Sequence, residues 1–188
     1  MPRNRVYYER KPRDFYPTPA WVTKKLLSAW PVSNVVYEPA CGNGAMVAPL
    51  VESGRTVYAS DIAPVGVPGA AVSDFLKDPC PFPLPHFGFD IVTNPPFGPM
   101  GRLGVSFIER ALKSNARRVF MLLPIAFDCG KTRRHIFADN PLFAAKIILH
   151  DRIKWFAHQT GKKVQPQENH AFYVWDREVR GRPVVIYK

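Results

Sequence analysis

Residues 35–46 read VVYEPACGNGAM and hold the pattern that decides the fold. Val35–Pro39 begins with apolar, β-branched residues, which predicts a short buried strand. Gly42 and Gly44 then predict a tight turn, because glycine adopts backbone conformations that are closed to other residues. A helix over Ala45–Glu52 completes a strand–turn–helix unit whose turn lets a ligand approach the backbone closely.

The same alternation of strands and helices continues on both sides of this unit. Alternating elements indicate an α/β fold with a mostly parallel sheet and right-handed crossovers. No helix separates the last two strands, so we expect an antiparallel hairpin there. The further predicted elements are a helix after Pro19 with Thr18 as its N-cap, strands at 56–61, 70–73, 89–93, 119–123, 147–156 and 171–175, and helices at 103–115 and 131–138.

These elements predict a seven-stranded sheet within a single domain. Residues 14–188 have the size of one ordinary domain, and a basic arm over 1–13 precedes them. Only 91 residues follow Phe97, and they must supply the remaining strands and helices. We therefore expect no separate target-recognition domain.

Ligands of open α/β sheets bind beyond the carboxyl ends of the strands, which points to the turns after Pro39 and Thr93. Asp61 ends the second strand, 17 residues after Gly44, where a carboxylate suits the paired hydroxyls of a ribose. A glycine turn alone also fits a purely structural bend, and a lone acid fits a helix cap. Together they favour nucleoside binding. Val47 replaces the third glycine of the dinucleotide fingerprint, which argues against a pyrophosphate cradle.

The tetrad Asn94-Pro95-Pro96-Phe97 directly follows a strongly predicted strand. Two prolines remove backbone donors and stiffen the chain, so the Asn94 side-chain oxygen and the Pro95 carbonyl remain as acceptors. Such a pair can hold both hydrogens of an NH2 group and favour its reactive, pyramidal form. Phe97 offers a flat face for stacking a base, worth about 1–3 kcal/mol. The plainer interpretation is a proline-stiffened turn that ends the strand.

The net charge of +11 is distributed unevenly along the chain. Residues 1–25 carry +5, residues 26–101 carry −4 and residues 102–188 carry +10. Clustered Lys and Arg attract polyanions through screened charge and counterion release, although a basic surface also serves solubility alone. The residues that we expect to contact phosphates are Arg102, Lys131, Arg133, Arg134, Lys162 and Lys163, together with the arm 1–13.

Other classes of protein find no support in the sequence. The three cysteines have no CxxC spacing and the five histidines form no ligand pattern, so we expect neither a disulfide framework nor a metal site. No apolar run of about 18 residues indicates a membrane span. The first residues lack the apolar stretch of a signal peptide, and we expect a cytoplasmic protein. The sequence does not indicate an oligomeric state.

Five stretches stand in a characteristic order: FYPTP at 15–19, EPACGNGAM at 38–46, SDI at 60–62, SDF at 73–75 and NPPF at 94–97. In this order they resemble the motifs of class I S-adenosylmethionine-dependent amino-methyltransferases. The similarity is greatest to N6-adenine methyltransferases whose cofactor motifs precede NPPF, and it covers residues 14–125. It implies a Rossmann-like fold, S-adenosyl-L-methionine as cofactor and a nucleic acid substrate. The motifs leave DNA and RNA both open, and we favour DNA.

The resemblance also implies roles for single residues. The segment 16–18 is expected over the methionine part of the cofactor, with Glu38 near its cationic amino group. Asp61 is expected to hold the ribose hydroxyls, Asp74 to accept from the adenine amino group and Phe75 to pack on the adenine ring. The target base is expected at Asn94, Pro95, Pro96 and Phe97. The expected cofactor-binding residues are Tyr16, Pro17, Thr18, Glu38, Ala40, Gly42, Gly44, Asp61, Ile62, Asp74, Phe75 and Asn94.

The reaction that this resemblance implies is a direct in-line displacement. The target nitrogen attacks the methyl group on sulfur, and no covalent enzyme intermediate forms. Two alternatives remain open. One is methylation of a protein glutamine at N5, which uses the same Asn-Pro-Pro chemistry, although that family usually has tyrosine at the position of Phe97. The other is a non-catalytic binding subunit that keeps the fold.

Overall fold

The structure, a computed structural model, describes residues 16–86, 88–155 and 168–188. The strands are β1 (Val35–Glu38), β2 (Thr56–Asp61), β3 (Ala71–Val72), β4 (Phe89–Thr93), β5 (Arg118–Pro124), β6 (Phe143–Ile148), β7 (His170–Asp176) and β8 (Val184–Tyr187). The helices are α1 (Ala20–Ala29), α2 (Val47–Glu52) and α3 (Arg102–Leu112), with short 3-10 helices at Pro99–Gly101, Phe127–Cys129 and Lys131–Ile136.

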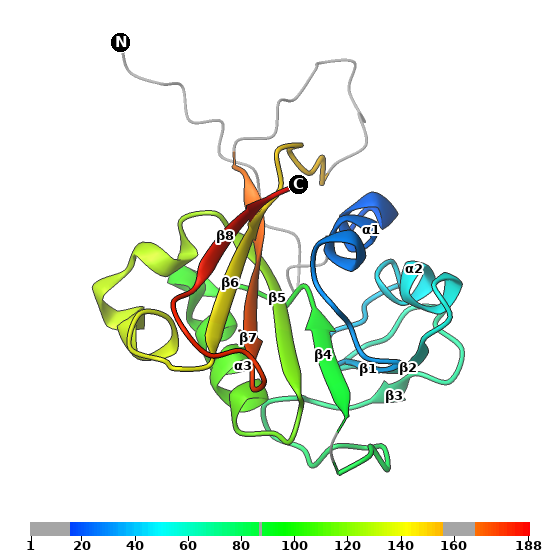
Figure 1. Ribbon diagram of the computed structural model, residues 1–188. Coiled ribbons are helices and arrows are strands. Elements are labelled where there is room, and N and C mark those ends of the chain that lie inside the picture. The colour runs from blue at the N-terminus through cyan, green and yellow to red at the C-terminus, as the bar shows by residue number, and fades with distance from the viewer. Residues whose placement is uncertain (1–15, 87, 156–167) are drawn as a thin grey trace.

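Within the described residues the strands form one eight-stranded sheet in the order β3-β2-β1-β4-β5-β7-β6-β8 (Figure 1). The strands β1 to β5 pair in parallel, and β7 runs antiparallel to both β5 and β6. The predicted α/β fold and its antiparallel C-terminal hairpin are therefore confirmed. The chain leaves β1 towards β2 on one side and reaches β4 on the other. This reversal of strand order brings the carboxyl ends of β1, β2 and β4 together at one edge.

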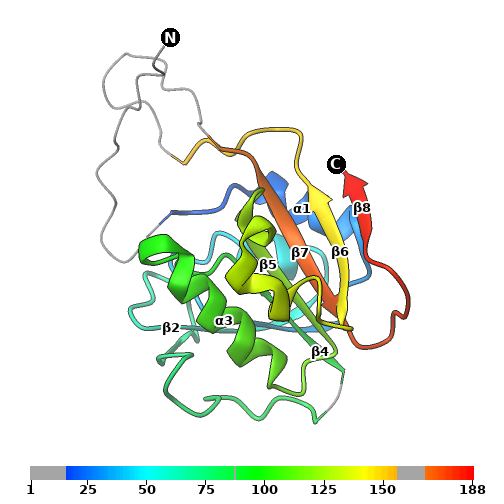
Figure 2. The same ribbon diagram turned by 90° about the vertical axis from the view of Figure 1, so that its left-hand side faces the viewer.

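Two apolar layers cover the sheet because successive side chains of a strand point to opposite faces. In β4, for example, Ile91 belongs to the cluster under α3, and Val92 belongs to the cluster under α1 and α2. In β5, Met121 and Leu122 divide in the same way. Figure 2 shows α3 in front of the sheet and α1 behind it. The central strands are buried on both faces, which explains their nearly continuous apolar sequences.

Three predicted elements differ from the structure. The strand predicted at 147–156 lies at 143–148, because the buried Leu149 and Ile153 prolong the apolar pattern beyond the strand. The helix predicted at 131–138 is a 3-10 helix that ends at Ile136. Thr18 is not the N-cap of α1, since Pro19 takes that position and makes no side-chain cap. The Thr18 hydroxyl instead bonds the amide of Asn94.

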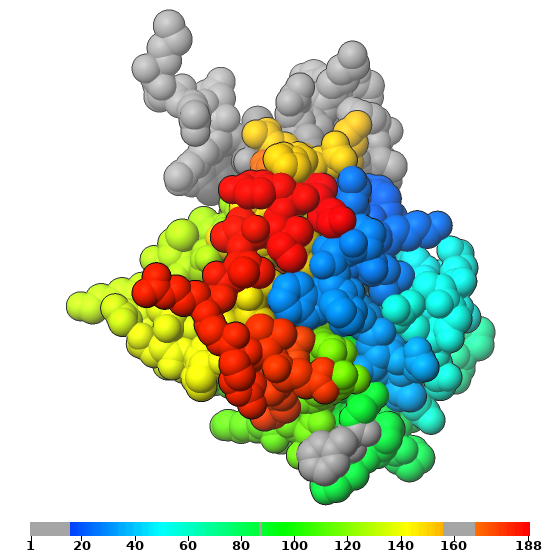
Figure 3. Space-filling model, viewed as in Figure 1, coloured from blue at the N-terminus to red at the C-terminus, as the bar shows by residue number. Residues whose placement is uncertain are grey.

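The eighth strand, β8, was not predicted. It is an edge strand that pairs only with β6 among the described residues, and Val184, Val185 and Tyr187 are exposed. In Figure 3 this red segment lies on the surface beside the blue segment of α1. The Lys188 ammonium donates to the Ser28 carbonyl at 3.0 Å, which fixes the end of the strand there. An exposed edge strand lacks the alternating apolar pattern by which strands are found in a sequence.

Candidate active site

A cavity of about 560 Å³ opens at the carboxyl ends of β1, β2 and β4. Its volume lies in the range of small-molecule and cofactor sites. The bend at Gly42 and the corner at Asn94 both contribute to its wall, so these two features share one cleft. The expected residues that line the cavity are Tyr16, Pro17, Thr18, Glu38, Ala40, Gly42, Asp61, Ile62, Asp74, Phe75, Asn94 and Pro96.

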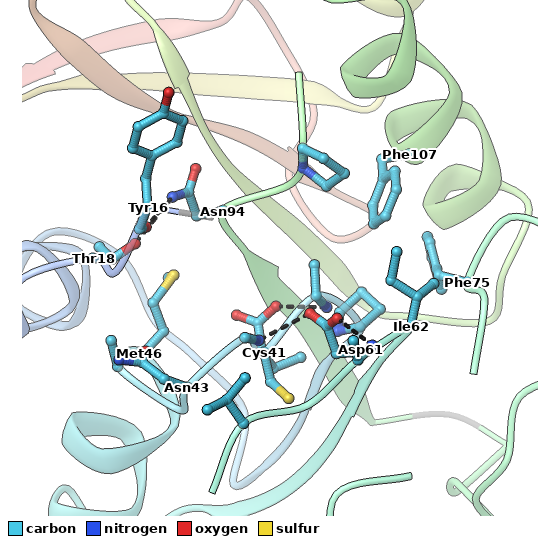
Figure 4. A pocket seen from close by; sticks show the side chains of 18 of the residues that line it. Tyr16, Thr18, Cys41, Asn43, Met46, Asp61, Ile62, Phe75, Asn94 and Phe107 are labelled. Atoms are coloured by element: carbon cyan, nitrogen blue, oxygen red, sulfur yellow. Dashed lines mark hydrogen bonds between the residues drawn. The ribbon is translucent and has the colours of Figure 1, made fainter. Parts of the chain in front are cut away.

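Asp61 ends β2 and holds the glycine turn. Its two carboxylate oxygens accept the backbone N–H groups of Gly42 at 2.9 Å and Ala63 at 2.8 Å (Figure 4). Each oxygen retains a further lone pair for a ligand donor. Gly44 has φ 78°, and a Cβ atom there would lie 3.0 Å from the side chain of Val67. Gly44 shapes the turn, and unlike Gly42 it does not line the cavity.

Glu38 places a carboxyl group on the cavity wall at the end of β1. Its side chain is 1% exposed, and the N–H of Ala40 donates to Oε1 at 3.0 Å. Burial raises the pKa of Glu38 to about 8, and the nearby charge of Asp61 adds to this effect. A buried carboxyl group of this kind favours a cationic partner, because a cation stabilises its ionised form.

This burial predicts a pH dependence of stability. The folded chain holds a proton on Glu38 up to about pH 8, whereas the unfolded chain releases it near the ordinary pKa of 4.5. Stability contributed by this group therefore falls as the pH rises from about 5 to 8, because the native state binds more protons there. We expect the melting temperature of the wild type to fall over this range relative to Glu38→Gln. If the melting temperatures of the two proteins changed equally with pH over this range, the raised pKa of Glu38 would be contradicted.

Asn94 directly follows β4, and its amide is fixed by the segment before α1. Its Nδ2 donates to the Thr18 hydroxyl at 3.1 Å and faces the Tyr16 carbonyl at 3.5 Å (Figure 4). The other end of the amide, Oδ1, is buried and has no hydrogen-bond partner among the described residues. A buried carbonyl oxygen without a partner costs free energy, so a ligand donor that reached this atom would be bound favourably.

Of the rest of the Asn94–Phe97 corner, only Pro96 lines the cavity. Pro95 is buried and, like Phe97, does not line the cavity. The ring of Phe97 stacks on the ring of His170, with 6.4 Å between the ring centroids. The His170 ring in turn meets the ring of Trp155 edge-on, with 5.1 Å between their centroids. Burial lowers the pKa of His170 to about 4, so this ring is neutral at physiological pH. The sequence does not predict His170 as a neighbour, because β7 lies far from the corner in the chain.

The opposite end of the cavity is apolar. Figure 4 shows Ile62, Phe75 and Phe107 together on the side away from Asn94. The rings of Phe75 and Phe107 lie 5.1 Å apart, and this aromatic pair provides a surface for a planar ring. Sequence analysis missed the contribution of α3, because Phe107 belongs to the face of the helix that packs on the sheet.

Asp74 lies at the same end of the cavity. Its Oδ1 accepts the N–H of Leu76 at 3.0 Å, and its Oδ2 pairs with the Lys77 ammonium at 2.9 Å. The hydrogen bond from Lys77 lowers the pKa of Asp74, which is therefore ionised at neutral pH. An ionised carboxylate in this position is an acceptor for an exocyclic amino group.

The basic residues expected to contact phosphates differ in their surroundings. Arg102 and Lys131 are exposed. Arg134 is exposed but pairs with Asp139 at 2.8 Å. The guanidinium of Arg133 is bound within the protein, since it donates to the carbonyls of Phe127 and Met100. Lys162 and Lys163, like the arm 1–13, lie outside the described residues.

The part of the chain that the structure describes has neither a metal cluster nor a membrane-spanning helix. No cluster of His, Cys, Asp and Glu in this part of the chain has the arrangement of a metal site. None of its helices is long and apolar enough to cross a membrane.

Comparison with protein-family models gives no match for this sequence, and comparison with curated proteins gives none either. Solved structures do match. A putative class I S-adenosylmethionine-dependent methyltransferase from Listeria monocytogenes has a TM-score of 0.58 at 14% identity, over 89% of this chain and 61% of the other. The chain thus spans less than two thirds of that protein.

Two further matches are structures of proteins that are named as RNA methyltransferases. A putative RNA methyltransferase from Pyrococcus horikoshii has a TM-score of 0.62 at 12% identity, over 93% of this chain and 94% of the other. The 23S rRNA methyltransferase ErmE has a TM-score of 0.58 at 18% identity, over 88% and 71%. The fold of this chain is therefore the Rossmann-like fold of class I S-adenosylmethionine-dependent methyltransferases.

Proposed function

We propose that the chain is an S-adenosylmethionine-dependent methyltransferase that acts on the exocyclic N6 of adenine in nucleic acid, with DNA favoured over RNA. The observation that carries this proposal is the Asn94 amide beside a cavity of cofactor size. Its Nδ2 is anchored by Thr18, and its Oδ1 is buried without a partner among the described residues. An anchored acceptor of this kind suits the NH2 group of a base.

The cavity residues fit S-adenosylmethionine by charge and shape. Glu38 is buried and favours a cationic group, which the amino group of the methionine part supplies. Asp61 has lone pairs left for the ribose hydroxyls beyond the two backbone N–H groups that it accepts. Asp74 and Phe75 stand at the aromatic end, where they suit the amino group and ring of adenine.

The reaction needs few chemical groups from the protein. When bound, the cofactor supplies a methyl group on a positively charged sulfur. Asn94 orients the target nitrogen through its Oδ1, and Thr18 keeps that amide from rotating. The protein thus holds the target nitrogen in place and supplies a fixed amide dipole. A preorganised dipole accelerates a reaction because it need not reorient during the reaction. The nitrogen loses its proton to water after methyl transfer, so a strong base is not required.

A nucleic acid substrate is supported by charge. Residues 102–188 carry +10, and the exposed Arg102 begins α3 close to the Asn94–Phe97 corner. Basic side chains such as Arg102 can contact phosphates, and phosphate contacts position a substrate without reading its sequence. The names of two structures with the same fold refer to RNA methyltransferases, which agrees with a nucleic acid substrate for this chain.

The proposal is tested by incubating the protein with cofactor labelled in its methyl group and, separately, with DNA, RNA and a protein extract. We expect label in nucleic acid, with DNA labelled more strongly than RNA. Label in protein alone would overturn the proposal and favour the alternative of a protein methyltransferase, such as one acting on glutamine N5. Calorimetry that shows no cofactor binding would overturn the proposal and favour a non-catalytic binding subunit.

A further inference from the structure

The chain forms a closed loop between the Asn94–Phe97 corner and α3. The carbonyl of Phe97 accepts the N–H groups of Leu103 at 3.1 Å and Gly104 at 3.3 Å. Residues 98–102 therefore form a short loop whose two ends are joined at Phe97. Leu103 also lines the cavity, so the loop stands at the rim of the candidate active site.

Met100 occupies the tip of this loop in a strained conformation. Its φ is 54° and its ψ is 20°, and it is the only residue other than glycine with positive φ in the described part of the chain. A side chain other than that of glycine is sterically strained in this region, and most such positions hold glycine or asparagine. The Met100 side chain is nevertheless 73% exposed, so it gains little from burial in return. Strain without a packing benefit is a feature of functional positions.

The loop is held rigid by Arg133. The guanidinium donates to the carbonyl of Met100 at 2.8 Å and to the carbonyl of Phe127 at 2.7 Å, and it lies 3.9 Å above the Phe127 ring. A Cβ atom on Gly101 would come within 2.7 Å of this guanidinium and 2.9 Å of the Phe127 ring, and its φ of 75° is one that other residues rarely adopt, so glycine is favoured there. Arg133 therefore ties the loop after β4 to the loop after β5. Met100 is presented to solvent from a backbone that cannot easily relax.

We propose that Met100 is a wedge that enters the base stack of the nucleic acid and takes the place of the target adenine. This inference rests on the proposed function. An adenine within a duplex must leave the stack to reach Asn94, and breaking its stacking and pairing costs free energy. Apolar side chains, methionine among them, offset such a cost by inserting between base steps. The rigid loop reduces the loss of conformational entropy on binding, and the exposed Arg102 beside it suits a phosphate.

The test compares methylation of random-sequence oligonucleotides supplied as duplexes and as single strands. We expect Met100→Ala to lower the rate on duplexes by about tenfold or more, and the rate on single strands by less than about threefold, because only the duplex must be unstacked. Met100→Leu should retain the rate on duplexes. Val185→Ala removes a side chain that is 54% exposed on β8 and should leave both rates unchanged.

Met100→Gly distinguishes a role of the Met100 side chain in unstacking the duplex from a role in the stability of the fold. It relieves the positive φ, so its melting temperature should not fall below that of the wild type, while its rate on duplexes should be as low as that of Met100→Ala. Equal losses on duplexes and single strands, or no loss on duplexes, would overturn the wedge. So would a wild type that methylates single strands only. A wild type that methylates no nucleic acid would overturn the proposed function itself.

Discussion

Replacing Asn94 by alanine should lower kcat by about 10²–10³-fold, the loss expected when one preorganised catalytic dipole is removed. The reason is that Asn94→Ala removes the buried Oδ1 that we assign to the target amino group. The affinity for cofactor should change far less, since Glu38 and Asp61 remain. Single-turnover rates and calorimetry with the cofactor measure the two effects separately.

Two further variants sharpen this prediction. Asn94→Asp keeps an acceptor but places a second oxygen where Nδ2 now faces the Thr18 hydroxyl and the Tyr16 carbonyl, so we expect an intermediate rate. Asn115→Ala is the control. It removes an exposed asparagine whose side-chain amide contacts the ring of His86, and the variant should behave as wild type. Near-normal turnover of Asn94→Ala would exclude the role of its oxygen.

Replacing Asp61 by alanine should weaken cofactor binding by about 10²-fold or more. Charge-assisted hydrogen bonds are worth about 1.5–3 kcal/mol each, and the two ribose hydroxyls lose their acceptor together. The variant should also lose about 1–3 kcal/mol of stability, because the N–H groups of Gly42 and Ala63 lose their partner. Calorimetry with the cofactor and chemical denaturation measure these two losses.

Asp61→Asn distinguishes the two roles of this residue. An asparagine retains one acceptor oxygen for the turn, so its stability should lie between those of the wild type and Asp61→Ala. Its cofactor affinity should stay low, because the charge is lost. Full affinity in Asp61→Asn would mean that the charge of this side chain has no part in binding.

Much of the fold was predictable because the central strands are short, apolar runs followed by glycine, proline or acidic residues. Val35–Glu38 and Phe89–Thr93 are strands close to their predicted bounds. The bounds at the periphery were harder to predict. The edge strand β8 has an exposed surface without alternation, and the apolar residues after Ile148 are buried without forming a strand.

The cavity could be predicted from local motifs, whereas contacts between distant segments could not. Asp61, Asp74 and Asn94 each end or follow a predicted strand, and parallel strands bring such ends together. The bond from Asn94 to Thr18 joins positions 76 residues apart, and a plain capping role for Thr18 was the simpler interpretation. The internal role of Arg133 was equally hidden, because a basic residue in a loop resembles a phosphate contact.

The central claim is that the buried oxygen of Asn94 directs methyl transfer to the N6 atom of adenine. Mass spectrometry of nucleosides, released from DNA and RNA after incubation with protein and cofactor, tests it most directly. We predict N6-methyladenine with the wild type and a yield at least about 10²-fold lower with Asn94→Ala. A methylated nucleoside other than N6-methyladenine, or equal yields from both proteins, would contradict the account.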